Sequence, residues 1–426
     1  MIKVLNSKNK NFYKDLKKFL ELRKININYK STKVLKIIED VKRNGDRALI
    51  KYEKKFNSNS KIKITKKDIK KSIKKLDLKV KRSIDLAYNR ILKFHSNQKY
   101  KGFKFKDELD NKFEYKFCPI EKIGIYVPGG SASYPSTVLM NAIPALLANV
   151  KNITMVTPSS KGNLNPGVIY AAYKCNIKNI YNIGGAQAIA ALAYGTKKIE
   201  KVNKIVGPGN KYVSAAKKEI FGEVGIDMIA GPSEITVVAD DFSNSDWIAS
   251  DLISQAEHDK FSQSILISSS FKILKKTENS IKKQLKSLER KRIASFSLSK
   301  FGLFIKTFSN KEISKIINII APEHLELNIK NYNIIKNKIN NVGSIFLGKY
   351  SPEAVGDYLA GPNHVLPTTG TAKFSSGLSV YDFLKRISYI NLSKKGIENL
   401  GPSVITLSEF EGLKGHSNSV KLRIKK

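Results

Sequence analysis

The chain has 426 residues, of which 41% are hydrophobic, and a formal net charge of +40. This length predicts two or three folded domains, and the ordinary hydrophobic content argues against a disordered chain. No stretch reaches the ~18 uninterrupted apolar residues of a membrane span, and Met1 to Asn6 lack the apolar run of a signal peptide. Cys118 and Cys175 are too few for a disulfide framework or a thiolate zinc site, so a cytoplasmic protein is expected.

The high charge permits two interpretations. A strongly basic chain is typical of nucleic-acid binders. Here, however, the lysines are scattered over much of the chain, arginine is scarce, and many lysines stand in polar segments such as 61–75 and 282–291. This pattern favours a general drift in composition over solvated helix faces, and a specific nucleic-acid partner is not expected.

Residues 1 to about 120 are predicted to be mostly helical. Leu35, Ile38, Val41 and Leu49 recur at near-helical spacing, and 83–94 forms a second amphipathic stretch. Nothing in this segment indicates chemistry, and His95 is expected to be structural.

From about residue 121, short apolar runs alternate with glycine turns and helices. The runs are 123–127, 153–156, 177–183 and 202–206, and predicted helices follow at 186–194 and 211–221. Further apolar runs stand at 235–239, 264–267 and 343–347. Repeated strand, turn and helix units predict parallel sheets with crossover helices, here in two doubly wound α/β domains.

Beyond about residue 380 the pattern becomes helical again. Short helices are predicted at 381–387, 394–400 and 403–412, with a break at Gly401-Pro402. Such a tail is too small to bury a core of its own, so it is expected to dock on its own chain or on a partner.

The five histidines are few for a chain of this length, and four of them lie in acid- or amide-rich surroundings. These four are His258, His324, His364 and His416. A lone core histidine is usually a satisfied structural group, but four in such company favour function.

The first of these clusters is compatible with a metal site. Ser245 is predicted to cap a helix on which Gln255 and His258, three positions apart, share one face. An amide oxygen and an imidazole nitrogen can bind zinc together, and Asp357 and His416 are candidates to complete a mixed nitrogen and oxygen site. Spacing alone favours the alternative, an ordinary solvated helix end.

Glu323 and His324 are adjacent, and Pro322 restricts the backbone before them. A carboxylate and an imidazole offer two bases of different strength, as a site with two proton transfers requires. Glu323 could equally be a first-turn helix acid that accepts from backbone N–H groups. The glycine turns are weak evidence singly, because none has the G-x-G-x-x-G spacing of a dinucleotide fingerprint.

Taken together, the ordered motifs resemble those of the histidinol dehydrogenase family. The motifs are Tyr126-Val127-Pro128-Gly129-Gly130, Gly184-Gly185-Ala186-Gln187, Gly207-Pro208-Gly209-Asn210, Ala230-Gly231-Pro232-Ser233-Glu234, Ser254 to Asp259, Ala321 to Leu325 and Gly356 to Thr368. The resemblance covers nearly the whole chain and is densest from Gly124 to His416. The heavy lysine loading departs from the family but lies outside these motifs.

The resemblance implies a role for each matching position. Zinc ligands would be Gln255, His258, Asp357 and His416, and the acid/base pair would be Glu323 and His324. Tyr126, Gln187 and Asn210 would contact NAD. Substrate contacts would come from Ser233, Gln255, His258, His324, Asp357, His364, Glu411 and His416.

The resemblance also implies the reaction and the architecture. One zinc ion per subunit and two NAD molecules would serve the oxidation of L-histidinol through L-histidinal to L-histidine, the last step of histidine biosynthesis. His324 would accept the alcohol proton, and Glu323 would activate water for the second step. Two Rossmann-like domains are expected at 126–234 and 235–380. Residues 1–125 would form a helical region that joins the second of them, and 381–426 a helical tail that completes the site across a homodimer.

Two other classes of function remain open. A zinc hydrolase could use the same ligands, with Glu323 as the base for metal-activated water. A basic nucleic-acid binder would use the α/β body as a scaffold only. Reduction of NAD with histidinol, and the salt dependence of nucleic-acid binding, would distinguish the three.

Overall fold

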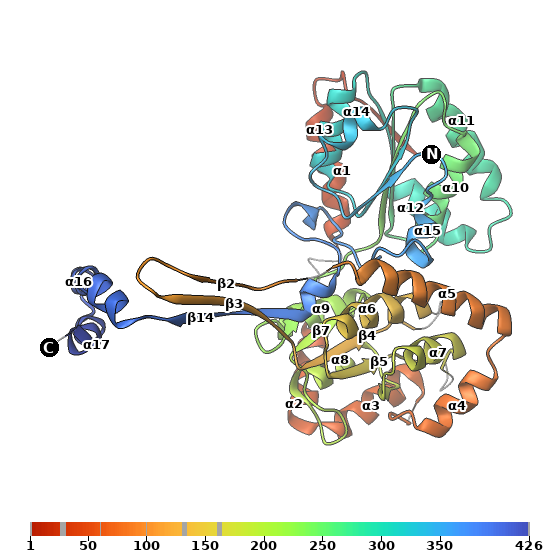
Figure 1. The fold of residues 1–426 in the computed structure, drawn as a ribbon. Coiled ribbons are helices and arrows are strands. Elements are labelled where there is room, and N and C mark those ends of the chain that lie inside the picture. The colour runs from red at the N-terminus through yellow and green to blue at the C-terminus, as the bar shows by residue number, and fades with distance from the viewer. Residues whose placement is uncertain are drawn as a thin grey trace. The chain divides into compact units, whose positions relative to one another are not determined.

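The computed structural model describes residues 2–25, 31–59, 61–98, 100–129, 134–159 and 164–424, which form two compact units (Figure 1). Unit 1 comprises Met1–Asn97 and Glu121–Asp382, and unit 2 comprises Gln98–Ile120 and Phe383–Lys426. Unit 1 contains two parallel sheets, and unit 2 contains an antiparallel sheet and two helices. The predicted α/β class with two parallel-sheet domains is therefore confirmed. None of the described helices combines the length and the apolar character that crossing a bilayer requires.

One domain of unit 1 is built on a six-stranded parallel sheet. In spatial order its strands are β1 (Lys3–Asn6), β11 (Gly302–Lys306), β10 (Gln263–Ser268), β9 (Glu234–Ala239), β12 (His324–Asn328) and β13 (Ser344–Leu347). Strands β9 and β10 are buried along their whole length, as expected of central strands with both faces covered. The predicted runs 235–239, 264–267 and 343–347 coincide with three of these strands.

Helices cover both faces of the six-stranded sheet, which makes this domain doubly wound (Figure 1). One face packs against α1 (Phe12–Glu21), α13 (Asn310–Ile320) and α14 (Asn333–Lys336). The other packs against α10 (Ser245–Ala256), α11 (Phe271–Gln284) and α12 (Lys291–Phe301). The N-cap of α10 is Asn244, whose side chain accepts from the backbone N–H groups of Asp246 and Trp247, and not Ser245 as the sequence predicts.

The other domain of unit 1 is built on a five-stranded parallel sheet. In spatial order its strands are β6 (Asn179–Tyr181), β5 (Asn152–Val156), β4 (Lys122–Tyr126), β7 (Lys204–Val206) and β8 (Gly225–Ile226). Its crossover helices are α6 (Pro135–Leu147), α7 (Pro166–Lys174), α8 (Gly185–Tyr194) and α9 (Lys211–Ile220). The predicted helices 186–194 and 211–221 match α8 and α9 closely.

The N-terminal region is divided between the two domains, whereas the sequence predicts that it joins the second domain as a whole. Strand β1 and helix α1 do belong to the six-stranded sheet. Helices α2 (Thr32–Asn44) and α3 (Asp46–Asn57) instead bury Val34, Ile38 and Leu49 in the core that includes α8 and α9. Helices α4 (Lys66–Lys74) and α5 (Leu78–His95) follow and contact α7 and α6. The reason is tertiary, because an apolar helix face does not specify which sheet it will cover.

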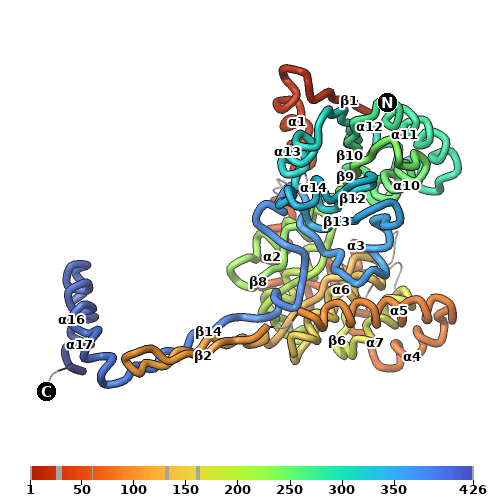
Figure 2. Tube along the Cα trace, turned by 45° about the horizontal axis from the view of Figure 1, so that its top comes forward, coloured from red at the N-terminus to blue at the C-terminus, as the bar shows by residue number. Residues whose placement is uncertain are grey.

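Unit 2 contains strands that the sequence does not predict. Strands β2 (Phe103–Lys106) and β3 (Lys112–Pro119) form a hairpin, and β14 (Leu384–Asn391) pairs antiparallel with β3 (Figure 2). Where a helix at 381–387 is predicted, the chain forms a short 3-10 helix, η3 (Val380–Phe383), and then strand β14. Helices α16 (Lys394–Phe410) and α17 (Lys414–Ile424) follow.

Helix α16 continues through the predicted break at Gly401-Pro402. A Cβ on Gly401 would lie 3.1 Å from Val420 and 3.2 Å from Ile424, so glycine allows α17 to approach closely. This packing stabilises one continuous helix despite the N–H group that Pro402 lacks.

Candidate active site

The predicted acid/base pair, Glu323 and His324, lies at the amino end of one strand of the six-stranded sheet, beside the start of the neighbouring strand. His324 is the first residue of β12, Glu323 immediately precedes it, and Glu234 is the first residue of the adjacent strand β9. All three side chains are buried. Ligand sites in doubly wound sheets usually lie at the carboxyl ends of the strands, so this placement departs from the common rule.

The backbone of Glu234 holds both members of the pair. Its N–H donates to Glu323 Oε2 at 2.8 Å, and its carbonyl oxygen lies 3.0 Å from His324 Nδ1. A carbonyl oxygen can only accept, so Nδ1 must carry the proton of the neutral imidazole. The lone pair is then on Nε2, which is buried and has no hydrogen-bond partner among the described residues.

Burial changes the acidity of both groups. It raises the pKa of Glu323 well above its ordinary value, and the nearby Glu234 and Asp357 carboxylates act in the same direction. Burial also lowers the pKa of His324, although the Asp357 carboxylate opposes this effect. The result is a neutral imidazole with a free Nε2 beside a carboxylate that is more basic than an exposed one.

Acidic side chains surround the free nitrogen of His324. Asp357 Oδ1 lies 3.7 Å from Nε2 and Glu353 Oε1 lies 3.9 Å away, both from helix α15 (Glu353–Tyr358). The three groups lie close enough to one another to hold a cation. Gln255, at the end of α10, satisfies its amide when its nitrogen donates to Glu353 Oε1 at 3.1 Å and its oxygen faces the N–H of Glu234 at 3.3 Å.

Most of the predicted site residues line one cavity of about 540 Å³ in unit 1. The predicted residues that line it are Asn210, Ser233, Gln255, His258, Glu323, His324, Asp357 and His364. His364 is held by the carbonyl oxygen of Asp357, 2.8 Å from its Nδ1, and its Nε2 lies 3.5 Å from Thr137 Oγ1. Three of the four predicted zinc ligands, Gln255, His258 and Asp357, therefore share this cavity. Their amide oxygen, imidazole nitrogen and carboxylate oxygen form a donor set that suits zinc.

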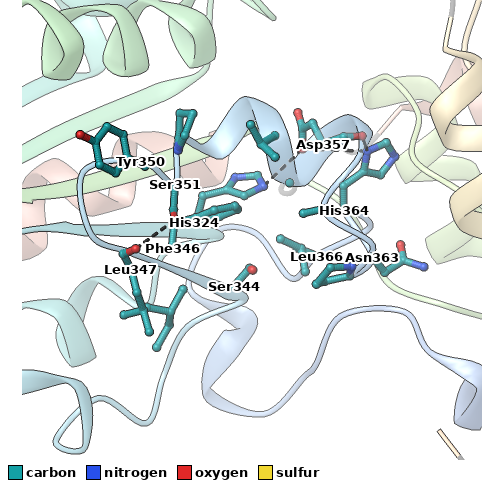
Figure 3. A pocket seen from close by; sticks show the side chains of 16 residues that line it. His324, Ser344, Phe346, Leu347, Tyr350, Ser351, Asp357, Asn363, His364 and Leu366 are labelled. Carbon is teal, nitrogen blue, oxygen red and sulfur yellow. Dashed lines mark hydrogen bonds and ion pairs between the residues drawn. The ribbon is translucent and has the colours of Figure 1, made fainter. Parts of the chain in front are cut away.

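A smaller cavity of about 310 Å³ adjoins the same group of residues (Figure 3). His324, Asp357 and His364 line both cavities. Figure 3 shows Phe346 and Leu366 among the mostly apolar side chains of the smaller one. His324 thus borders both cavities.

The three predicted NAD contacts lie at the carboxyl end of the five-stranded sheet. Tyr126 ends β4, Gln187 lies in the first turn of α8, and Asn210 caps α9 through its side-chain oxygen. The Tyr126 hydroxyl accepts from the N–H of Gly185 at 3.1 Å, and burial raises the pKa of Tyr126 to about 12. Asn210 lines the main cavity, while Tyr126 and Gln187 are buried behind the turns. Gly130, from the first predicted motif, lies outside the described residues.

Several residues around the site have no signal in the sequence. Glu53, on α3, is fully buried and accepts from the N–H of Gly184 at 3.0 Å and from Gln187 Nε2 at 2.8 Å. Arg23 and Glu353 are likewise buried beside Glu234 and His324. Isolated charges in lysine-rich or acidic helices look like solvated residues, so only the tertiary structure reveals them.

The last two predicted site residues, Glu411 and His416, belong to unit 2. Glu411 is the C-cap of α16 and His416 lies in α17, and both are exposed. Their roles in the site therefore remain predictions.

The fold and the site define an α/β enzyme in which a buried carboxyl group and a buried imidazole face a cavity that many polar residues line. Residues 21–424 match the family model described as histidinol dehydrogenase. The proteins named histidinol dehydrogenase from Pelagibacter ubique and Acinetobacter baylyi are 60% and 46% identical to this chain, over 100% and 91% of both sequences. A crystal structure of histidinol dehydrogenase from Elizabethkingia anophelis has a TM-score of 0.92 and 40% identity, and the match covers 99% of this chain and 98% of that one. The chain belongs to the histidinol dehydrogenase family and is an oxidoreductase.

Proposed function

We propose that the enzyme oxidises L-histidinol through L-histidinal to L-histidine, as the last step of histidine biosynthesis, with one zinc ion per subunit and two NAD molecules. The observation that carries this proposal is the free, buried Nε2 of His324 beside a buried Glu323, in a cavity shared with Gln255, His258 and Asp357. Two bases of different strength suit a substrate that must lose an alcohol proton and then gain a water oxygen. The family membership supports the choice of substrate.

His324 acts first in this scheme. Its neutral imidazole accepts the proton of the substrate hydroxyl at Nε2, and the resulting imidazolium is stabilised by Asp357, 3.7 Å away. Glu323 then deprotonates the water that attacks the aldehyde, for which its raised pKa makes it a suitable base. NAD supplies the hydride acceptor in each oxidation.

Gln255, His258 and Asp357 would hold the zinc ion, and His416 would supply the fourth ligand. When bound, zinc would orient the substrate through its imidazole and amino nitrogens, which is a positioning role. Ser233 and His364 line the same cavity and would contact the substrate. Tyr126, Gln187 and Asn210 would contact NAD.

The decisive experiment follows the absorbance of NADH when purified enzyme receives histidinol and NAD, with and without a chelator. We expect two NADH per histidinol, loss of activity on chelation and recovery with zinc. Cleavage of peptides or esters without NADH formation would identify a hydrolase instead. Nucleic-acid binding that falls steeply with salt, in a preparation without dehydrogenase activity, would identify a nucleic-acid binder.

We further propose that the active site is completed by the tail of a second copy in a homodimer. Unit 2 exposes large apolar side chains, among them Phe410 at 90% and Leu422 at 72%, and such surfaces are typical of interfaces. A lone subunit would lack His416 and would leave the zinc site open.

Mixing the inactive variants His258→Ala and His416→Ala after dissociation tests this arrangement. One composite site then carries both defects and the other carries neither, so about half of the normal activity per heterodimer should return. Absence of recovery, despite demonstrated subunit exchange, would mean that the tail completes its own subunit's site. The cytoplasmic location remains part of this proposal and is tested by fractionation.

A further inference from the structure

A buried arginine from the N-terminal segment reaches the centre of the active-site framework. Arg23 lies in the short 3-10 helix η1 (Leu22–Ile25), and only 4% of its surface is exposed. Its Nη1 lies 3.3 Å from Glu234 Oε1 and 3.2 Å from Oε2, and its Nη2 donates to the carbonyl oxygen of Ile320 at 2.8 Å. The arginine therefore joins the start of β9 to the end of α13.

The partner of this arginine holds both members of the acid/base pair. The backbone N–H of Glu234 donates to Glu323, and its carbonyl oxygen accepts from His324. The Glu234 carboxylate also accepts from the backbone N–H of Thr369 at 2.9 Å. Fixing the Glu234 side chain with a guanidinium nitrogen that contacts both carboxylate oxygens therefore also fixes the backbone that orients the pair.

The surrounding chain leaves room for the guanidinium. Gly370 has a φ of +83°, and a Cβ on it would lie 2.6 Å from Arg23 Nη2. The neighbouring Thr368 accepts from the backbone N–H of Gly231 through its hydroxyl, at 2.7 Å. The start of β9, the end of α13 and the chain around residue 370 thus meet at the arginine.

Stability alone is a poor explanation for this pair. A buried ion pair is often no more stabilising than apolar residues of the same volume, because both charges lose their hydration. Arg23 Nε, moreover, is buried without a hydrogen-bond partner in the described part of the chain. The pair does supply a fixed orientation, because the planar guanidinium contacts the Glu234 carboxylate through Nη1 and the Ile320 carbonyl oxygen through Nη2.

We propose that Arg23 is a positioning residue, which acts through Glu234 to hold Glu323 and His324 in the geometry needed for proton transfer. The inference rests on the proposed function for the roles of Glu323 and His324. It assigns a part in catalysis to a segment whose sequence indicates none.

The test compares Arg23→Gln and Arg23→Lys with Leu20→Ala as the control. Leu20 is buried in the same domain, three positions before Arg23, and has no place in the site. For each variant, kcat and KM are measured with histidinol and with histidinal, together with zinc content and Tm. Proton and nitrogen NMR of enzyme with labelled histidine follows the signal of the His324 Nδ1–H group. This signal is assigned by its disappearance in His324→Asn.

We expect Arg23→Gln to lower kcat for both substrates by about tenfold to a hundredfold, the scale of a small misplacement of reacting groups. KM should change by less than about threefold, because the substrate contacts remain. Arg23→Lys should recover part of the loss, and the His324 Nδ1–H signal should move in Arg23→Gln but stay in Leu20→Ala. Should Arg23→Gln fail to fold, Arg23→Lys carries the same comparison.

Two results would overturn the inference. One is an unchanged Nδ1–H signal and an unchanged kcat per zinc-loaded site in Arg23→Gln. The other is an equal loss of kcat in Leu20→Ala at a matched Tm, which would reduce Arg23 to a stability residue. The NMR comparison needs no turnover, so it decides the positioning role even if the wild-type enzyme does not oxidise histidinol and the proposed function fails.

Discussion

Glu53 provides a sharp test of how the five-stranded domain holds the turn that we propose to bind NAD. Its Oε1 accepts from the N–H of Gly184 and from Gln187 Nε2, and its Oε2 accepts from Asn57 Nδ2 at 2.6 Å. No cation pairs with it among the described residues, and burial raises its pKa. Glu53 thus places an acceptor at the amino end of α8, where a phosphate often binds in related folds.

The expected cost of Glu53→Ala follows from these contacts. The substitution leaves the Gly184 N–H and the Gln187 amide buried without an acceptor, and each such group costs about 1–3 kcal/mol. The predicted loss in free energy of unfolding is therefore about 2–6 kcal/mol. In Glu53→Gln the amide oxygen can replace Oε1, and Asn57 can turn its own oxygen toward the new NH₂ group. That variant should lose about 1 kcal/mol or less.

Chemical denaturation followed by circular dichroism measures the two free energies, and titration with NAD measures the affinity. We expect Glu53→Ala to bind NAD more weakly than Glu53→Gln, because Gln187 is no longer held. Equal stability of the two variants would refute the hydrogen-bond argument. A normal NAD affinity in a destabilised Glu53→Ala would instead separate Gln187 from cofactor binding.

Three further predictions concern the proposed acid/base pair, the carboxyl group of Asp251 and unit 2. In single turnovers, Glu323→Gln should slow histidinal oxidation more than histidinol oxidation, whereas His324→Asn should impair both. Equal losses of rate for both variants with both substrates would mean that the two residues share their roles. Burial raises the pKa of Asp251 from 3.8 to about 6, so its contribution to stability is complete below pH 3.8 and is lost as the pH rises through about 6. Asp251→Asn should therefore flatten the fall in free energy of unfolding across this window in metal-free protein, and an unchanged slope would contradict the assignment. A Cβ on Gly396 would lie 1.9 Å from Asn111 Oδ1, so Gly396→Ala should expose α16 to proteolysis, and wild-type resistance would show that the contact is dispensable.

The sequence predicts the parts of the fold whose pattern is local. Strands 235–239 and 264–267 are buried on both faces and read as continuous apolar runs, so they are found without tertiary information. The sequence does not predict strand β12, because it begins with His324 and contains the buried Glu326, and such polar residues are not typical of a buried strand. The sequence does not predict strand β14 either, because its pairing with β3 joins residues that most of the chain separates.

The candidate site shows the same division. Local motifs predict that Ser233 and His258 are site residues, and the structure places both in the wall of one cavity. Helical periodicity selects Leu35 for the core, yet Leu35 is 45% exposed and Val34 beside it is buried. Glu53 and Arg23 cannot be distinguished from solvated charges, because their burial depends on segments more than a hundred residues away.

The pairing of β14 with β3 also has a consequence for synthesis of the chain. Asn391 pairs with Lys112, so the hairpin leaves the ribosome about 280 residues before its third strand exists, a wait of roughly 14 to 56 s at common translation rates. Meanwhile the edge of β3 that β14 will cover stays unpaired. Charged residues alternate with aromatic ones along β3 from Lys112 to Phe117, and a charged edge resists pairing with a foreign strand. Lys112 and Lys116 thus place positive charge on the edge that is open while the chain is unfinished.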